Sequence, residues 1–216
     1  MRAPHCEPMC NAYGNRVPYS EYLEEFSQIR LPLILPEGRG VPNLEPREDI
    51  RPTEFAPVIR RVSDGVELAQ LRWGFAPARP KAPLVINFRS EGRRFERGRC
   101  LVPASHFFEF TGSRYPKTKW RFTKAGEPWF CFAGLWRPTP EAEAEAGAGT
   151  GAEDGAEGRF TLLTAAPGPD VAPYHDRQPV VLERDRWADW LDLLRPEADL
   201  LVPSAAGALE VTQDRP

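Results

Sequence analysis

The chain has 216 residues, of which 41% are hydrophobic, and a formal net charge of −3. This length suits one sizeable domain, and the composition is ordinary for a soluble globular protein. The chain contains no apolar run of membrane-spanning length and no apolar signal core near its N-terminus, so we expect neither membrane insertion nor secretion, and a cytoplasmic location.

The predicted elements are mostly short strands. Residues 19–30 are expected to form a helix capped by Ser20, with its apolar side chains on one face. The prolines across residues 31–57 predict an extended, irregular run. Only residues 185–194 again show helical spacing, and the tryptophans there are expected in the core. The pattern indicates an α+β fold: a single mostly antiparallel β domain, an open barrel or paired sheets, with a few peripheral helices. Strands are predicted over 55–62, 66–73, 84–88, 100–110, 119–123, 128–135, 159–164 and 179–183.

The charges are unevenly distributed. Residues 141–158 are rich in Gly, Ala and Glu, carry six acidic side chains and no basic one, and are predicted to be a disordered surface loop joining two strands. Basic residues gather instead in 72–99 and in 110–126, and the second run contains no acid. Such runs are usually solvated faces, but these alternate with aromatic residues such as Tyr115, which is typical of a groove for single-stranded nucleic acid. The basic residues are Arg72, Arg79, Lys81, Arg89, Arg93, Arg94, Arg97, Arg99, Arg114, Lys117, Lys119, Arg121 and Lys124.

Cys10 follows Met9, which could itself be an initiator. If Met9 were the start and were removed, Cys10 would carry a free α-amine beside its thiol. An aldehyde condenses with such an amine to an imine, and the thiolate then closes a thiazolidine ring. The amine is suited to this near neutral pH because its pKa is about 7.7 to 8.0. The alternative is an ordinary residue near a frayed terminus.

The other three cysteines suggest no chemistry of their own. The four cysteines show no CxxC spacing, which argues against a zinc knuckle or a redox dithiol. In a cytosolic protein they are expected to be reduced. We predict neither a metal nor a cofactor. The cysteines are Cys6, Cys10, Cys100 and Cys131.

Glu109 and His175 are candidate proton-transfer groups. Glu109 lies among phenylalanines in a hydrophobic strand, where desolvation is expected to raise its pKa and suit it to proton transfer. The alternative is a structural ion pair with an arginine. Strand alternation places His106 on the opposite face from Glu109. His175 precedes a buried strand on an expected loop, where catalytic residues often lie, although an idle surface histidine is more common.

Asn87 and Arg89 end a strongly apolar predicted strand. Their spacing of two aims both side chains at the same face of that strand. An amide and a guanidinium there are suited to holding a sugar-phosphate.

Several blocks of the sequence, taken in order, resemble the SRAP family (SOS response-associated peptidase domain). The segment Met9-Cys10-Asn-Ala-Tyr is similar to the family's start, and the resemblance extends to about Thr212. It therefore predicts an N-terminal extension, residues 1–8, that is not part of the mature protein, and an SRAP-like domain over 9–216 with an acidic insert at about 140–158. The blocks are Arg-Trp-Gly-Phe-Ala-Pro (72–77), Asn-Phe-Arg-Ser-Glu (87–91), Arg-Cys-Leu-Val-Pro-Ala-Ser-His-Phe-Phe-Glu-Phe (99–110), Phe-Ala-Gly-Leu-Trp (132–136) and His-Asp-Arg-Gln-Pro-Val (175–180).

The resemblance implies recognition of abasic sites in single-stranded DNA and a thiazolidine crosslink that shields the lesion. It makes Cys10 the nucleophile, Glu109 the general acid/base, and His175 a second acid/base group. It makes Asn87 the residue that positions the N-terminal residue or the sugar. It further implies a role in DNA repair in the SOS response, in the cytoplasm or nucleoid of a bacterium, for a protein expected to be a monomer.

The same resemblance implies the DNA contacts. Arg89 and one of Arg93 or Arg94 would bind the phosphates that flank the lesion, and Trp73 would pack near the nucleotide. The chain departs from the family in having Phe88 where an alanine is usual.

Two other functions are compatible with these residues. The first is a cysteine peptidase or hydrolase using Cys10, His175 and Glu109, with an activity that could be limited to removing the residues before Cys10. The second is a non-covalent module that binds single-stranded DNA through arginines and aromatics. For the covalent function, translation from Met9 is the favoured origin of a free Cys10 amine, and self-cleavage after Met9 is the alternative.

Overall fold

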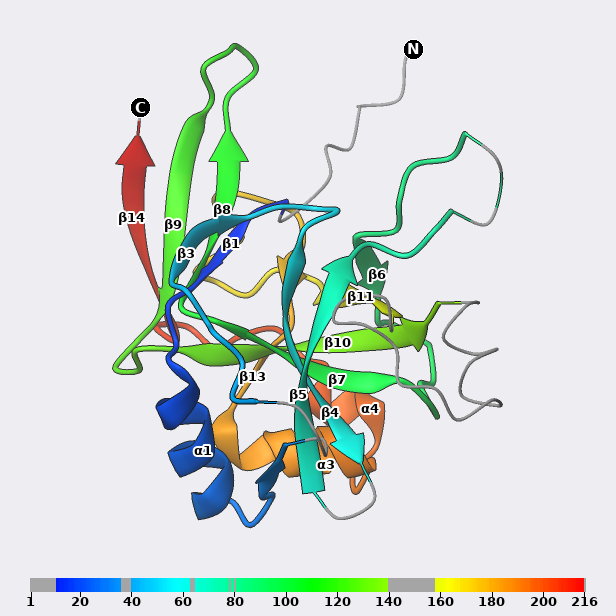
Figure 1. Ribbon diagram of the computed structural model, residues 1–216. Helices are drawn as coiled ribbons and strands as arrows, with labels where there is room; N and C mark the ends of the chain where they lie inside the picture. The colour runs from blue at the N-terminus through cyan, green and yellow to red at the C-terminus, as the bar shows by residue number, and fades with distance from the viewer. Residues whose placement is uncertain are drawn as a thin grey trace.

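The computed structural model describes residues 11–35, 40–62, 65–77, 79, 81–139 and 158–215. Its strands form two sheets (Figure 1). In the smaller sheet every pair of strands is antiparallel, and the order is β14 (Leu209–Arg215), β9 (Thr118–Lys124), β8 (His106–Thr111), β1 (Tyr13–Asn15) and β3 (Arg47–Ile50). In the larger sheet the order is β12 (Gln178–Pro179), β11 (Gly158–Ala165), β10 (Phe130–Pro138), β7 (Arg99–Ala104), β4 (Phe55–Val62), β5 (Gly65–Trp73) and β2 (Leu33–Ile34).

Three further pairings shape the larger sheet. β5 pairs with β11 in parallel at Trp73 and Phe160, which closes β5, β4, β7, β10 and β11 into a small barrel. β6 (Asn87–Arg89) pairs with β11 in parallel, and β13 (Val181–Leu182) pairs with β10. The α+β prediction, with mostly antiparallel strands in a barrel or paired sheets, is therefore confirmed.

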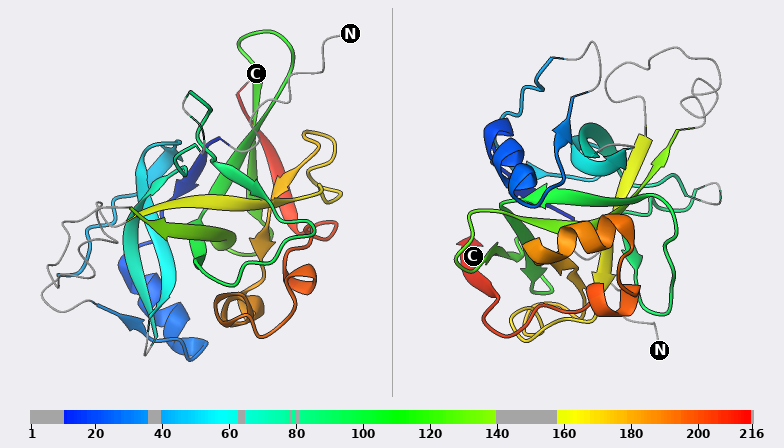
Figure 2. Two further views of the ribbon diagram at one scale, coloured as in Figure 1. Left: turned by 90° about the vertical axis from the view of Figure 1, so that its right-hand side faces the viewer. Right: turned by 90° about the horizontal axis from the view of Figure 1, so that it is seen from below.

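The larger sheet separates two hydrophobic cores. The inner core fills the barrel and the space between the sheets, and contains Trp73, Phe107, Phe132 and Phe160. The outer core lies between the outer face of the barrel and the helices α1 (Tyr19–Gln28), α3 (Trp187–Asp192) and α4 (Glu197–Leu200). Figure 2 shows α3 and α4 on the side of the molecule seen from below.

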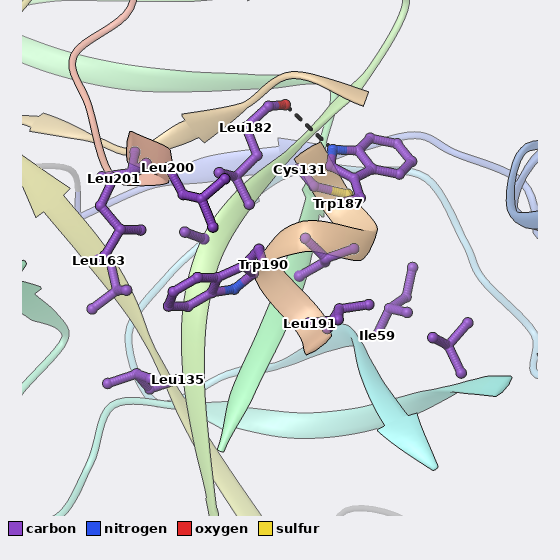
Figure 3. Packing of buried hydrophobic residues seen from close by; sticks show 14 of the residues in the cluster. Ile59, Cys131, Leu135, Leu163, Leu182, Trp187, Trp190, Leu191, Leu200 and Leu201 are labelled. Atoms are coloured by element: carbon purple, nitrogen blue, oxygen red, sulfur yellow. Dashed lines mark hydrogen bonds between the residues drawn. The ribbon is translucent and has the colours of Figure 1, made fainter. Parts of the chain in front are cut away.

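Helix α3 is held by its tryptophans, which lie in the core as predicted. Trp187 and Trp190 are fully buried. The indole N–H of Trp187 donates to the carbonyl oxygen of Leu182 (3.3 Å; Figure 3), and that of Trp190 donates to the carbonyl oxygen of Cys100 (2.9 Å). The 3-10 turn Arg184–Arg186 leads into α3. The expected helix over 185–194 is thus divided between that turn and α3.

The structure corrects the prediction of one strand over 100–110. The chain leaves the larger sheet at Ser105 and enters the smaller one, because the Ser105 amide donates to Gly14 O (2.8 Å) and its hydroxyl accepts from the Arg16 amide (3.0 Å). Glu109 therefore belongs to β8 in the smaller sheet, rather than to the strand that lines the barrel.

The predicted elements before residue 57 are only partly correct. The first helix is confirmed but ends at Gln28, and Pro18 is its N-cap, so Ser20 is not the cap. The irregular run over 31–57 contains the short strands β2 and β3, which form by pairing with β5 and β1. β1 and β14 were not predicted.

Candidate functional site

Glu109 is buried at the end of the inner core. Glu109 lies in the middle of β8 and is 2% exposed. The register of β8 with β9 places Trp120 opposite Glu109, on the same face as Phe107 of the inner core. A carboxylate therefore stands between the two sheets, where water is largely excluded, as the sequence predicted.

His106 and Phe108 lie on the other face of β8, as alternation predicted. The His106 ring is buried, with Nε2 2.9 Å from Glu48 O, and it packs edge-on against Phe108 at 4.9 Å between ring centroids. Burial lowers the pKa of His106, so the ring is a neutral structural group rather than part of the candidate site.

His175 lies on the loop that links β11 to β12, and this loop packs against β9. The ring of Tyr174 contacts Trp120, which is opposite Glu109, with centroids 4.7 Å apart. Nδ1 of His175 lies 3.1 Å from the Arg177 amide nitrogen and 3.0 Å from Oδ1 of Asp176. Burial lowers the pKa of His175, with the Asp176 carboxylate opposing the shift, so the imidazole is neutral near pH 7. A neutral imidazole is able to accept a proton during a reaction.

Asn87 and Arg89 share one face of β6, as their spacing predicted. β6 runs parallel to β11, with Asn87 beside Leu162 of the inner core and Arg89 beside Thr164. Asn87 therefore faces the same interior as Glu109, while Arg89 is exposed at the end of the strand. Because β6 pairs with β11, Asn87 and Arg89 lie beside residues that come more than seventy positions later in the chain.

Arg177 connects the His175 loop to β6 and was not among the predicted site residues. Its guanidinium pairs with Glu91, and Nη2 also donates to Thr164 O (2.8 Å) and Thr164 Oγ1 (3.0 Å). Thr164 is also the residue of β11 that pairs with Arg89, so this bond brings Arg177 close to the end of β6. The sequence signal was its position two residues after His175, within the last of the blocks that resemble the family.

Cys10 lies outside the residues that the structure describes. The described chain begins next to β8: Tyr13 pairs with Phe107, and the Phe108 amide donates to Ala12 O (3.0 Å). Because β1 and β8 are antiparallel, the same register continued by two residues would place Asn11 opposite Glu109. The candidate site therefore comprises Glu109 on β8, Asn87 and Arg89 on β6 and His175 on the loop that packs against β9.

Arg93 and Arg94 follow β6, which ends at Arg89, and belong to the loop that leads to β7. The Arg93 guanidinium lies 4.6 Å from the ring of Phe88, and Phe88 packs on the outer core. Arg93, Arg94 and Arg97 line a surface hollow of ≈ 680 Å³ together with Trp136. Arg93 and Arg94, one of which was expected to bind a phosphate, therefore line this hollow, whereas Arg89 lies at the end of β6.

Trp73 is not available to contact DNA, which corrects the prediction made for it. Its indole is 0% exposed, donates from Nε1 to Ile86 O (2.9 Å), and stacks on Phe160. It also packs edge-on against Tyr13, with centroids 5.2 Å apart. Trp73 therefore supports β1 and β6 from within the inner core.

The two cysteines that the structure describes are buried. Cys100 and Cys131 are free thiols, and burial raises the pKa of each well above its ordinary value. Within the described ranges, no three His, Cys, Asp or Glu side chains come together as ligands for a metal ion. No helix in that part of the chain is long and apolar enough to cross a membrane.

The family model described as SOS response associated peptidase (SRAP) matches residues 9–213, nearly the whole chain. The chain belongs to the SRAP family. All the predicted site residues fall within this match, Cys10 included, whereas residues 1–8 precede it.

Curated relatives and solved structures agree with this assignment. The chain is 28% identical over 215 residues to the abasic site processing protein YoqW of Bacillus subtilis, covering 90% of this chain and 88% of YoqW. It is 26% identical to the abasic site processing protein YobE of the same organism, covering 90% of each. A crystal structure from Bordetella bronchiseptica superposes with a TM-score of 0.66 at 23% identity, covering 95% of this chain and 100% of that one. One from Bacteroides thetaiotaomicron gives a TM-score of 0.68 at 18% identity, covering 95% and 92%. These two structures support the fold alone.

Proposed function

We propose that this SRAP protein acts on abasic sites in single-stranded DNA and joins them covalently to Cys10. The proposal requires removal of the residues before Cys10, so that its α-amine is free. The crosslink shields the lesion, and peptidase activity is limited to the removal of the N-terminal residues. The names of the curated relatives support the substrate class.

The proposed reaction proceeds in two steps from the ring-opened sugar. The Cys10 amine adds to the C1′ aldehyde, and the resulting hydroxyl leaves as water once Glu109 has donated a proton to it. The Cys10 thiol then adds to the carbon of the imine, its proton passes to the nitrogen, and a thiazolidine is formed. One water is released overall, and no oxidant or reductant is required.

Each group has a role that follows from its position. Glu109 returns to the carboxylic acid between steps by taking a proton from the attacking amine, which is general acid/base work by one carboxyl group. His175, neutral and half-buried, is the second proton acceptor. Asn87 faces the same interior and holds the sugar, while Arg89, exposed at the end of β6, binds a flanking phosphate.

The observation that carries the proposal is the position of Glu109 relative to β1. The carboxylate is buried in β8, and β8 is hydrogen-bonded to β1 at Ala12, two residues from Cys10. Two peptide units span at most about 7.6 Å between Cα atoms. The length of this tether supports the proposal, because Ala12 is bonded to Phe108, the neighbour of Glu109.

The test uses protein released with Cys10 as its first residue and single-stranded DNA containing one abasic site. A denaturant-resistant band is expected, with the mass of protein plus DNA less one water. Cys10→Ala and Cys10→Ser should both abolish it, and protein that retains Met9 should give none. Glu109→Gln should slow the reaction by about 10²- to 10⁴-fold. Glu67→Gln, a carboxylate of β5 paired with Arg60, is the matched control and should react at the wild-type rate.

Two results would contradict the proposal. Purely reversible binding by the processed protein would indicate a non-covalent binding module. Turnover of peptides by protein with an internal Cys10, without any DNA adduct, would indicate a hydrolase.

A further inference from the structure

The hairpin that joins β8 to β9 carries an aromatic and basic tip. Thr111 and Thr118 are the last cross-strand pair, so residues 112–117 form the loop. Figures 1 and 2 show this loop projecting from the body of the molecule, beside the C-terminal strand β14. β8 also carries Glu109, so the loop is a direct extension of the strand that holds the candidate acid/base.

The structure divides the second basic run of the sequence into two parts. Lys119 and Lys124 are buried, with Nζ of Lys119 3.5 Å from the centroid of the Phe108 ring. Arg121 is paired with Asp214 at 2.9 Å. These cations are neutralised by the fold and are not available to a ligand. At the tip of the hairpin Arg114 and Tyr115 are exposed, and Lys117 is partly exposed.

Tyr115 is the most exposed of the large hydrophobic side chains in the described part of the chain, at 90%. Nζ of Lys117 lies 5.9 Å from the centre of its ring, and Arg114 precedes it with an exposed side chain. The sequence has no acidic residue from Phe110 to Gly126. A flat ring between two cations matches a nucleobase and its two flanking phosphates, and is the pairing by which proteins bind single strands without sequence preference.

The distance from the hairpin tip to Glu109 suits a strand whose abasic site lies at Glu109. Six residues separate Glu109 from Tyr115, which at about 3.3 Å per residue is at most about 20 Å. Stacked nucleotides rise by about 3.4 Å each, so this distance corresponds to at most about six nucleotides. Arg89 lies in the other sheet, where β6 pairs with β11.

We propose that the tip formed by Arg114, Tyr115 and Lys117 binds single-stranded DNA on one side of the lesion, with Tyr115 stacked on a base. This inference rests on the proposed function for the identity of the ligand. It adds a second contact region, which lies in a different sheet from Arg89 of β6.

The experiment measures reversible binding by fluorescence anisotropy, using Cys10→Ala protein so that no crosslink forms. Three labelled oligonucleotides carry an abasic site at the centre, near the 5′ end or near the 3′ end. Tyr115→Ala should weaken binding of the central substrate about 5-fold or more, and Tyr115→Phe should bind as the parent does. Leu194→Ala, at an exposed apolar position on the helical side, is the control and should have no effect.

Truncation distinguishes a direct contact from a loss of folding. One of the two end-placed substrates should bind the Tyr115→Ala variant and its parent equally, because the strand no longer reaches the hairpin tip. Arg114→Ala should lower the slope of log affinity against log salt concentration by about 0.7 on the central substrate.

Each outcome bears on one proposal. Equal affinity of Tyr115→Ala and its parent for all three substrates would overturn the hairpin contact and indicate another partner, such as a protein. A similar loss in Tyr115→Ala and Tyr115→Phe would overturn stacking. Normal hairpin-dependent binding by a wild-type protein that never crosslinks would refute the covalent function and leave the hairpin contact intact.

Discussion

Gly14 is the position at which a single methyl group should disturb both stability and chemistry. A Cβ at Gly14 would lie 2.2 Å from Cε1 of His106 and 2.9 Å from Glu48 O. Carbon atoms pack at about 3.5 Å or more, so the ring or β1 would have to move by about 1.3 Å. The ring has little room, because it is 1% exposed and its Nε2 is already 2.9 Å from Glu48 O.

The expected cost of Gly14→Ala follows from these contacts. Overpacking a buried position costs about 1–3 kcal/mol, and losing the bond between His106 and Glu48 O costs about 1 kcal/mol more. The free energy of unfolding should therefore fall by about 2–4 kcal/mol, and Tm by roughly 4–16 °C for a domain of this size. Because β1 leads back to Cys10, the crosslinking rate should fall as well.

The assay is urea unfolding of the two single variants and of Gly14→Ala/His106→Ala. We expect the double variant to be less destabilised than the sum of the singles by about 1 kcal/mol or more, because replacing the imidazole of His106 by a methyl group leaves room for the new side chain at position 14. Gly40→Ala is the control, since nothing lies within 4 Å of a Cβ there. Measurement at pH 8 keeps His106 neutral in both states. Its pKa is lowered by burial, so the unfolded chain binds more protons below about pH 6.5 and stability falls there. Additive effects, or a Gly14→Ala variant as stable as wild type, would refute this account of the packing.

Three further outcomes follow from the structure. Burial lowers the pKa of His175, so the imidazole should act as a base above about pH 6.5 and lose that role below it. In single-turnover kinetics, the ratio of wild-type to His175→Gln crosslinking rates should therefore be constant above about pH 6.5 and fall toward one at lower pH. A ratio independent of pH would contradict a role of His175 as a base. Replacing residues 139–157 by Asn-Gly should leave Tm unchanged in calorimetry, because the strands they join are paired at Pro138 and Gly158, a register that a two-residue turn closes. Cys100 and Cys131 should be alkylated only at the rate of global unfolding, as followed by peptide mass spectrometry, and rapid labelling of either would contradict their burial.

The fold class was predictable because the apolar alternation and the turn residues are local. The division of residues 100–110 at Ser105 was not, because the alternation continues through it and the break is made by hydrogen bonds to Gly14 and Arg16. β1 has only three residues, and it forms because β3 and β8 pair on its two sides. Such pairing is a tertiary effect that no short pattern contains.

The candidate site was predictable where residue type and spacing determine the side chain's face, as for Glu109, Asn87 and Arg89. The prediction for Trp73 was wrong because the same features, an aromatic residue beside arginines, describe both a stacking platform and a core residue. Its burial is decided by Phe160 and Tyr13, which come from distant strands. Arg177 was missed because only its bond to Thr164 places it beside Arg89.

The N-terminal segment is positioned by the core rather than by a loop, and this bears on how a terminal residue could act as a nucleophile. Tyr13 is fully buried, packs on Trp73 and Phe132, and pairs with Phe107. A strand held on both edges cannot slip by one residue without turning Tyr13 out of the inner core. If Cys10 is the nucleophile as proposed, the register of β1 limits how far its short tether lets it move from Glu109, and such a restriction lowers the entropic cost of a reaction between them.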